Sequence, residues 1–321
     1  MRLRIPHFLW IFLITAPGLH PESSTSGADF LKVDTGAFAG AAGGAFTAVS
    51  EGVASLRYNP AGLAWLGRRE LQLTVKPWIG DTMFFSVSYI EPVKPAKGIS
   101  LGFDLTVFTT MGIDQFDVGG FPLGSTALFD LAGSFYLSYR LPLPGLSVGG
   151  GLRFIFRDVL DYYVYGLAFD LGLLWRTSFL SFTSSAHKNL SLAVSLRDVG
   201  PPLNFSDSTI GEWTSHLPTS FNIGLQYIFF SRAGASLWLA ADISSYLYEE
   251  GTRYRIGLTW QPLSILSLRC GYQNGAELQA FSFGVGILVP MGGSAVRVDY
   301  AFIPLTSQMD PVHSISLAFL F

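Results

Sequence analysis

The sequence predicts an all-β protein, a membrane-spanning antiparallel β-barrel of about 14 strands with a small helical N-terminal hatch inside its lumen. Two observations carry this prediction. Charged residues make up only 13% of the 321 residues, against roughly 25% in an ordinary soluble domain. From residue 70 onward, apolar residues alternate with small or polar ones at a period of two, which is typical of strands with one apolar face.

A closed barrel is the architecture that reconciles these observations. Past the N-terminus, no stretch offers the roughly 20 consecutive apolar residues that a spanning helix needs. Lipid tolerates no open sheet edge, so a chain of strands must close on itself to cross a membrane. A soluble sandwich would also alternate, but its outer face would be richer in charge.

The first residues resemble an export signal. Arg2 and Arg4 precede a short apolar run at 8–16, and a small-residue exit follows it. This order predicts a cleaved signal peptide over residues 1–18, with cleavage anywhere between 18 and 28. A helical anchor is the alternative, but the apolar run is short for one.

Residues 29–69 do not alternate and are expected to form the hatch. Gly36, Gly40 and Gly44 recur at a four-residue spacing, which allows close helix packing. Asn59 followed by Pro60 is a common helix start, with Asn as N-cap and Pro at the first helical position. On these residues alone, the Asn59-Pro60-Ala61 motif has a purely structural interpretation.

The alternating runs and their connections predict the barrel over residues 70–321. The short turns at 141–145, 231–233, 262–264 and 290–292 are expected in the periplasm, and the long connections at 110–125 and 198–218 outside. The link at 176–188 is an exception. The expected strands are 70–78, 81–91, 98–109, 126–140, 146–157, 162–176, 188–199, 219–230, 234–245, 252–262, 264–273, 277–289, 293–304 and 312–321.

The alternation also assigns faces. Val298 and Tyr300 are expected to face lipid while Arg297 and Asp299 face the lumen. A one-residue slip would move such charges into lipid, at a cost of about 2–4 kcal/mol for each Arg near the midplane. The other charges expected inside are Lys76, Asp104, Asp130, Arg140, Arg153, Asp170, Arg197, Asp242, Arg255 and Arg269.

Eight of these charges form a candidate lumen network: Arg153, Asp170, Arg197, Asp242, Arg255, Arg269, Arg297 and Asp299. The structural interpretation is a set of paired ladders, because a plugged lumen must satisfy its charges. A functional alternative is that an Arg captures the carboxylate of a ligand by bidentate hydrogen bonds.

The final strand carries a further prediction. Ile315, Leu317, Phe319 and Phe321 fall on one side of it, so the run ends on an aromatic residue of the apolar face. This ending resembles the assembly signal of outer-membrane barrels, in which Phe321 would be read by the barrel assembly machinery.

Nothing in the sequence points to catalysis or a cofactor. Cys270 is the single cysteine, which rules out an intrachain disulfide. Gly98-Ile99-Ser100-Leu101-Gly102 matches a nucleophile pattern, but that pattern requires a strand-to-helix turn and here lies in a predicted strand. We therefore expect no enzyme activity, metal or cofactor. The net charge of −3 gives no argument for nucleic acid.

Two blocks resemble a known family. Residues 37–66, AFAGAAGGAFTAVSEGVASLRYNPAGLAWL, are similar to the N-terminal region of FadL-type long-chain fatty-acid transporters and their PorV/PorQ-like relatives. Residues 281–321, and VDYAF at 298–302 above all, resemble the PorV/PorQ-like branch. The resemblance implies a hatch that plugs a fourteen-stranded barrel, with Asn59, Pro60 and Ala61 as its motif.

The resemblance also implies a function. A FadL-type protein takes up a fatty acid or another hydrophobic molecule passively and releases it through a lateral opening or past a mobile hatch. Phe46, Tyr58, Phe84 and Trp238 are then candidates for the ligand path, although each could simply pack the hatch against the wall. The expected partners are a hydrophobic small molecule, outer-membrane lipid and the assembly machinery. A PorV-like role in protein secretion or surface attachment is the main alternative, and an adhesin-like barrel a third.

Overall fold

The computed structural model describes most of the chain. The described ranges are 26–110, 112–117, 119–159, 162–179, 188–207, 211–232, 234–249, 251–274, 280–305 and 309–321. The predicted signal peptide, residues 1–18, lies outside them. Within these ranges, none of the helices is both long and apolar enough to cross a membrane.

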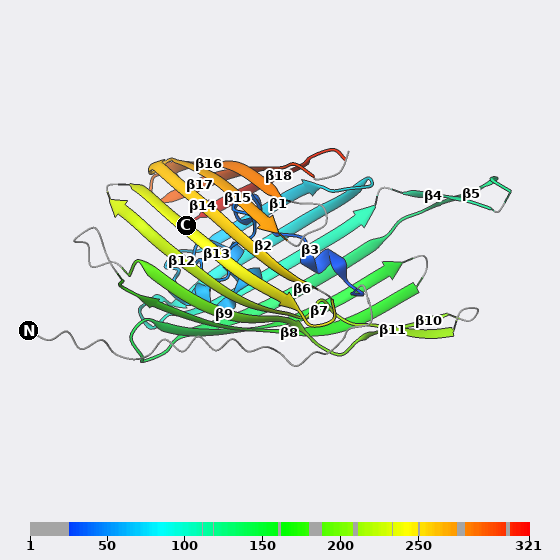
Figure 1. Ribbon diagram of the computed structural model, residues 1–321, viewed down its shortest axis with the longest axis horizontal. Helices are drawn as coiled ribbons and strands as arrows, with labels where there is room; N and C mark the ends of the chain where they lie inside the picture. Colours follow the sequence, from blue (N-terminus) through cyan, green and yellow to red (C-terminus); the bar gives the residue numbers. More distant parts are fainter. Residues whose placement is uncertain are drawn as a thin grey trace, which may run out of the picture.

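Among the described residues, 14 strands form one closed barrel in which every neighbouring pair is antiparallel (Figure 1). The strands are β1 (Glu70–Pro77), β2 (Thr82–Lys94), β3 (Ile99–Thr110), β6 (Phe129–Arg140), β7 (Leu146–Val159), β8 (Tyr162–Thr177), β9 (Leu190–Val199), β12 (Ser220–Arg232), β13 (Ala235–Tyr246), β14 (Thr252–Leu263), β15 (Leu266–Asn274), β16 (Phe281–Met291), β17 (Ser294–Ile303) and β18 (Val312–Leu320). The predicted fold class is thus confirmed.

The first and last strands close the barrel. β1 pairs with β18 from Glu70 opposite Leu320 to Val75 opposite Ile315. Just beyond this ladder, Arg69 and Phe321 exchange two backbone hydrogen bonds, of 3.2 and 3.1 Å. The closure leaves no free sheet edge at this seam, as lipid requires.

Two further hairpins modify the prediction for the long connections. The segment expected as a loop at 110–125 contains β4 (Ile113–Phe116) paired with β5 (Pro122–Thr126). The segment at 198–218 contains β10 (Leu203–Asp207) paired with β11 (Gly211–Ser215). Both hairpins extend beyond the same end of the barrel (Figure 1). We call this the long-loop end and the opposite one the short-turn end.

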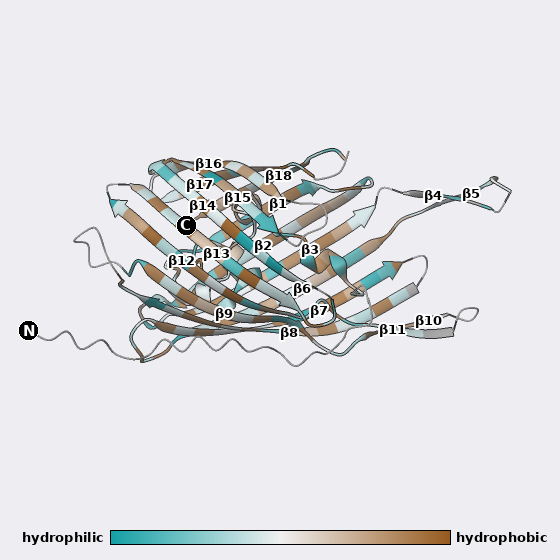
Figure 2. Cartoon of the chain, in the orientation of Figure 1, coloured by the Kyte–Doolittle hydropathy of each residue, from teal (hydrophilic) through white to brown (hydrophobic). Residues whose placement is uncertain are grey.

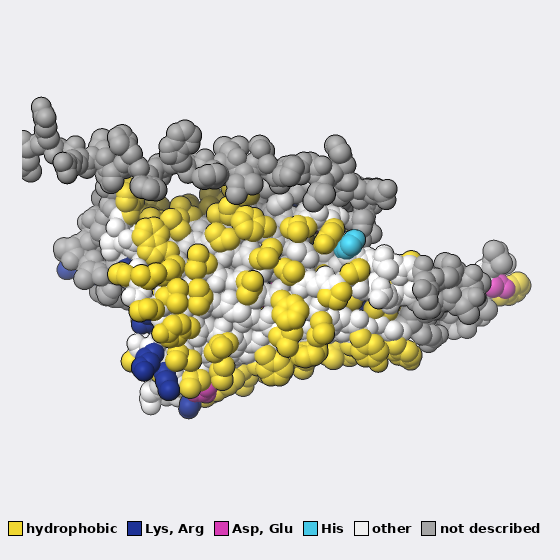
Figure 3. All heavy atoms as spheres, turned by 90° about the horizontal axis from the view of Figure 1, so that it is seen from below, with side chains coloured by type: hydrophobic (Ala, Val, Ile, Leu, Met, Phe, Trp, Pro, Cys, Tyr) yellow, Lys and Arg dark blue, Asp and Glu magenta, His cyan; other side chains and the backbone are white. Residues whose placement is uncertain are grey.

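The strands show the predicted two faces. Hydrophobic and hydrophilic residues alternate along them (Figure 2), and hydrophobic side chains cover the outer wall, whereas Lys and Arg gather at the end opposite the projecting hairpin (Figure 3). Exposed aromatic residues mark both rims, as in membrane barrels. They are Phe129, Tyr163, Tyr254 and Phe281 toward the long-loop end, and Tyr139, Trp175, Trp260 and Phe321 toward the short-turn end.

The hatch, residues 29–69, lies inside the barrel and is built from short helices (Figure 1). They are the 3-10 helix η1 (Asp29–Lys32), α1 (Ala37–Ala41), α2 (Ala54–Tyr58) and the 3-10 helix η2 (Pro60–Trp65). One more 3-10 turn, η3 (Pro95–Lys97), joins β2 to β3. Helices this short are marginal in water, so packing against the wall must stabilise them.

Glycines in the wall let the hatch approach closely. The Gly36, Gly40 and Gly44 spacing was expected to serve helix–helix packing, but α1 contacts barrel strands instead. On the wall side, a Cβ at any of seven glycines would come within 2.6 Å of a hatch atom, so larger residues would push the hatch away. They are Gly102, Gly149, Gly172, Gly224, Gly257, Gly271 and Gly284.

Candidate functional site

The hatch runs through the lumen from one mouth to the other. At the long-loop end, Phe30 and Leu31 of η1 pack in an apolar cluster with Leu203 and Leu217, from the β10–β11 region. At the short-turn end, the indole N–H of Trp65 donates a 2.9 Å hydrogen bond to Ser147 Oγ on β7. A molecule crossing the barrel must therefore pass between hatch and wall, and this interface is the candidate site.

The Asn59-Pro60-Ala61 motif fixes the hatch to β8. Asn59 Oδ1 accepts from the backbone N–H of Ala61 at 3.1 Å, so Asn59 is the N-cap of η2, as the sequence indicated. Its Nδ2 donates to Thr47 O at 3.0 Å and to Leu173 O at 3.2 Å. One amide therefore links two parts of the hatch and the barrel wall.

Three of the four predicted ligand-path residues meet in one aromatic cluster. Phe46 and Tyr58 of the hatch lie 5.5 Å apart between ring centroids. Phe38 lies 5.2 Å from Phe46 and 6.4 Å from Trp238 of β13, and all four rings are buried. We call these four residues the aromatic cluster. The remaining candidate, Phe84, is buried on β2 outside this cluster, beneath the Lys76 ammonium at 5.5 Å.

The predicted lumen charges divide into separate groups. In the first, Arg153 Nη2 donates to Asp170 at 2.7 Å and the same guanidinium pairs with Asp198, while Arg197 lies 3.9 Å from Asp198. Arg153 belongs to β7, Asp170 to β8, and Arg197 and Asp198 to β9. A guanidinium between two carboxylates satisfies its donors in a place that water does not reach.

The second group joins the barrel seam. Arg297 donates to Asp299 and to Glu70, each at 2.7 Å, and Arg269 donates to Asp299 at 2.7 Å. Glu70 belongs to β1, Arg269 to β15, and Arg297 and Asp299 to β17. This group therefore crosses the closure between β1 and β18 on the inside of the barrel.

Asp242 and Arg255 have different partners. Asp242 accepts hydrogen bonds from the hatch backbone. Arg255 donates to Ser244 at 2.9 Å and, among the described residues, has no ion pair within 4 Å. The eight residues are all in the lumen, but they do not form one continuous network.

Sequence reasoning missed several residues of the site. Asp198 turns inward next to Arg197 because β9 has a bulge here, with φ of +55° at Asp198, and alternation alone cannot predict that. Arg57 of α2 is buried and donates to Leu31 O at 2.8 Å, while its Nε and Nη1 find no hydrogen-bond partner among the described residues. Phe38 stands in the Ala/Gly-rich block, where a large aromatic residue among small ones could have indicated a contact.

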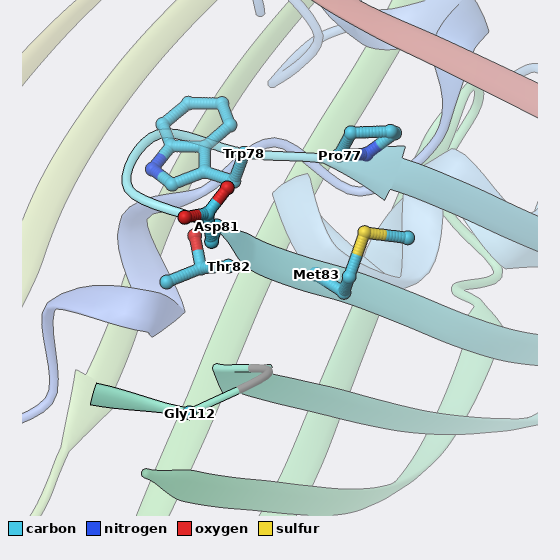
Figure 4. A pocket seen from close by; sticks show the side chains of 6 residues that line it. All are labelled: Pro77, Trp78, Asp81, Thr82, Met83 and Gly112. Carbon is cyan, nitrogen blue, oxygen red and sulfur yellow. The ribbon is translucent and has the colours of Figure 1, made fainter. Parts of the chain in front are cut away.

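A surface pocket of about 310 Å³ opens at the long-loop end (Figure 4). Pro77 and Met83 face it from the paired ends of β1 and β2, and Trp78 from the turn between them. The pocket thus offers an apolar surface at the rim of the barrel. Its full lining is Pro77, Trp78, Asp81, Thr82, Met83 and Gly112.

Ser100 and Cys270, the residues whose patterns were considered for chemistry, both lie within barrel strands. Ser100 is buried as the second residue of β3, inside a strand rather than at a strand-to-helix turn. Within the described ranges, no three His, Cys, Asp or Glu side chains are grouped so as to hold a metal ion. Cys270 is exposed on the outer wall, as expected for a lipid-facing residue.

These features define a plugged, membrane-spanning β-barrel. The chain belongs to UPF0164, an uncharacterised protein family whose model matches residues 24–321. A UPF0164 protein of Treponema pallidum (strain Nichols) is 25% identical over 160 residues, or 49% of this chain. The matched region covers 48% of that relative, about half its length.

Solved structures share the fold. A TodX monoaromatic hydrocarbon channel deltaS2 mutant aligns with a TM-score of 0.59 at 14% identity, covering 89% of this chain and 97% of that chain. A Pseudomonas aeruginosa FadL homologue gives 0.54 at 10% identity, covering 90% and 97%. The P. putida toluene transporter TodX gives 0.53 at 15% identity, covering 84% and 92%. At these identities, the likeness is one of fold.

Proposed function

We propose that this barrel is a passive outer-membrane transporter for hydrophobic small molecules such as long-chain fatty acids, with the hatch as its moving part. The observation that carries the proposal is the aromatic cluster. Phe38, Phe46 and Tyr58 from the hatch meet Trp238 from the wall, in a barrel whose inner face is otherwise rich in Ser, Thr and charged residues. An apolar interface between hatch and wall favours an apolar solute, which gains free energy when it leaves water for such a surface.

The physical basis of transport is partition. An apolar molecule gains free energy when it leaves water for an apolar surface, and the pocket beside Trp78 and Met83 offers such a surface at the long-loop end. To reach the aromatic cluster, the molecule would then have to enter the lumen between hatch and wall as the hatch shifts. The short hatch helices depend on packing against the wall, so the hatch would rearrange where contacts with the ligand replace those with the wall. No nucleotide is needed.

The surface of the barrel supports an outer-membrane location. Its apolar wall and two rims of aromatic residues match what lipid requires. In this orientation the long-loop end faces outside and the short-turn end faces the periplasm. The signal peptide and the reading of Phe321 by the assembly machinery remain predictions. Two of the similar structures are a monoaromatic hydrocarbon channel mutant and a toluene transporter, which supports an apolar substrate.

Uptake by cells tests the proposal. Expression in a host that lacks its own fatty-acid transporter should allow uptake of labelled long-chain fatty acid. Trp238→Ala should lower that uptake several-fold, while Trp260→Ala on the outer face of β14 should leave it unchanged. Lipid analysis of the purified protein should find an apolar molecule bound. Uptake equal to that of the empty host, with no bound apolar molecule, would rule the function out.

A surface-attachment role of the PorV type is supported by one feature. The β4–β5 hairpin projects from the barrel, and Phe121 at its tip is 70% exposed (Figure 1). Exposed aromatic residues at a projecting tip suit a protein contact. Replacing residues 113–126 by a short Gly-Ser turn should abolish co-purification of other envelope proteins in that case. In a transporter, the replacement should leave uptake intact.

A further inference from the structure

Three cations surround one indole ring at the short-turn end of the hatch. The guanidinium carbon of Arg140 lies 4.3 Å from the ring centroid of Trp65, and that of Arg176 lies 4.9 Å away. The ammonium of Lys188 lies 5.3 Å from the same centroid. We call these four residues the Trp65 cluster. Its members come from the end of η2, the ends of β6 and β8, and the residue two before β9.

Backbone contacts hold the cluster in place. Arg140 Nη2 donates to Ala64 O in the hatch at 2.8 Å. The backbone N–H of Arg176 donates to Gly145 O at 2.8 Å, which ties β8 to the turn between β6 and β7. A Cβ at Gly145 would come within 2.6 Å of Lys188 Nζ, so the ammonium lies close against this turn. The three positive charges are therefore held together by the fold.

Among the residues that the structure describes, no ion pair within 4 Å joins the three cations of the cluster, Arg140, Arg176 and Lys188, to a carboxylate. The Nε atoms of both arginines are buried and, within the described ranges, have no hydrogen-bond partner. Glu51 acts on Arg176 only at longer range. Desolvation, together with Arg176 and Arg140, lowers the pKa of Lys188, as expected where like charges are crowded.

The indole offsets this repulsion only in part, because a cation–π contact is worth about 0.5–2 kcal/mol. An anion would satisfy the free guanidinium donors and the ammonium together. Apolar groups adjoin the charges, since Trp65 packs against a buried cluster that contains Ala61, Leu174 and Ala193. A ligand at this place would therefore meet positive charge beside an apolar seam between hatch and wall.

We propose that the Trp65 cluster is an anion-binding site at the periplasmic mouth, which takes the carboxylate or phosphate headgroup of a single-chain amphiphile. The choice of an amphiphile rests on the proposed function, because its chain would lie along the hatch seam. The anion site itself rests on three cations that share one indole ring and have no carboxylate within 4 Å in the described part of the chain. The cluster lies at the short-turn end of η2, where a molecule moving along η2 would leave the lumen.

Binding to the full-length barrel tests this site. Native mass spectrometry of the protein, released from a non-ionic detergent, can follow titration with dodecyl phosphate, dodecanoate and the uncharged dodecanol. The double variant Arg140→Gln/Arg176→Gln should bind both anionic probes about 10- to 100-fold more weakly, as expected for loss of charged hydrogen bonds. Its binding of dodecanol should be unchanged. Arg232→Gln, at the exposed periplasmic end of β12, is the matched control and should bind all probes normally.

A further variant and a competition measurement distinguish the ways in which the proposal could fail. Lys188→Gln removes a charge without touching a strand, so it reports on the site even where the double variant fails to fold, and it should weaken anionic probes about tenfold. Anionic binding that is equal in all variants overturns the site. If inorganic phosphate competes as well as dodecyl phosphate does, the alkyl chain contributes nothing, and the proposal that the ligand is an amphiphile is overturned. If no probe binds, dodecanol included, the proposed transport function fails instead.

Discussion

Asp242 on β13 accepts a 2.8 Å hydrogen bond from the backbone N–H of Phe46, a residue of the aromatic cluster 196 positions earlier in the chain. The same oxygen accepts from the backbone N–H of Thr47, also at 2.8 Å. One wall side chain thus satisfies two hatch donors beside Trp238. The hatch is held at this point by a single carboxylate, which makes the contact a place where hatch release can be tested.

Asp242→Ala should loosen the hatch while the barrel stays closed. Two buried N–H groups would lose their acceptor, at a cost of about 1–3 kcal/mol each. We expect faster proteolysis within residues 42–50 and a higher conductance of the barrel in planar bilayers. Asp130→Ala, whose carboxylate pairs with Arg157 toward the long-loop end, is the control for loss of a lumen charge. Equal proteolysis of the two variants would contradict the role assigned to Asp242.

Two adjacent glycines give a sharper test of hatch packing. A Cβ on Gly149 would lie 2.4 Å from the carbonyl carbon of Pro60 and 2.5 Å from Ala61 N, whereas on Gly150 the nearest atom is at 3.7 Å. Gly149→Ala should therefore destabilise the hatch by about 1–3 kcal/mol, as overpacking does. Gly150→Ala, one residue along the same strand, should be neutral. Urea unfolding of both refolded variants would show this difference, and equal midpoints would disprove it.

The Asn59 amide can be tested by comparing two substitutions. Asn59→Ala removes the cap and both bonds to carbonyls, so we expect a loss of about 1–3 kcal/mol. Asn59→Asp keeps the cap acceptor but turns an oxygen toward Thr47 O and Leu173 O. It should therefore be no better than Ala, although Asp is a good N-cap elsewhere. A near-normal Asp variant in thermal unfolding would mean that capping alone matters.

Much of the fold could be predicted because lipid imposes a strict pattern. Arg297 and Asp299 face inward, and Val298 between them is exposed, as period-two alternation required. Strand ends and the fourteen-strand order follow from the same pattern. The non-alternating segment was recognisable as the hatch because it lacked this period, and Asn59-Pro60 indicated where a helix begins.

The rest depends on contacts that a local pattern cannot express. The bulge that turns Asp198 beside Arg153 needs a left-handed residue, which alternation does not reveal. The gathering of Arg140, Arg176 and Lys188 on Trp65 brings together the β6–β7 turn and both ends of the β8–β9 connection, and local alternation does not reveal that they meet. The hairpins in the long connections were missed for another reason. They cross no membrane, so lipid imposes no period on them.

Breaking the Arg153 group should be costly. Arg153→Met leaves Asp170 and Asp198 as two buried carboxylates that face each other, and loss of one partner of a buried pair typically costs about 3–5 kcal/mol. The triple variant Arg153→Met/Asp170→Leu/Asp198→Asn should recover part of that loss, because it removes both carboxylates that Arg153 had paired, while Arg197 loses its partner Asp198. Urea midpoints of the three proteins measure this. If the triple variant is as unstable as the single one, packing rather than charge pairing explains the effect.

The hatch should also make stability depend on pH through Glu51. Desolvation is the main cause that raises the pKa of Glu51 above its ordinary value of 4.5, and the positive Arg269 and Arg297 offset it only in part. The unfolded chain therefore releases this proton near pH 4.5, while the folded chain keeps it to higher pH. Between the unfolded and the folded pKa of Glu51 the folded state binds more protons, so the stability that Glu51 contributes is lost as pH rises through its folded pKa.

Glu51→Gln should remove this pH-dependent loss of stability. The stability of Glu51→Gln relative to the unmodified chain should therefore increase between pH 4 and pH 8. Urea midpoints across this range, with exposed Asp310→Asn as control, measure the difference. Parallel pH profiles for Glu51→Gln and the unmodified chain would show that Glu51 is ionised alike in both states.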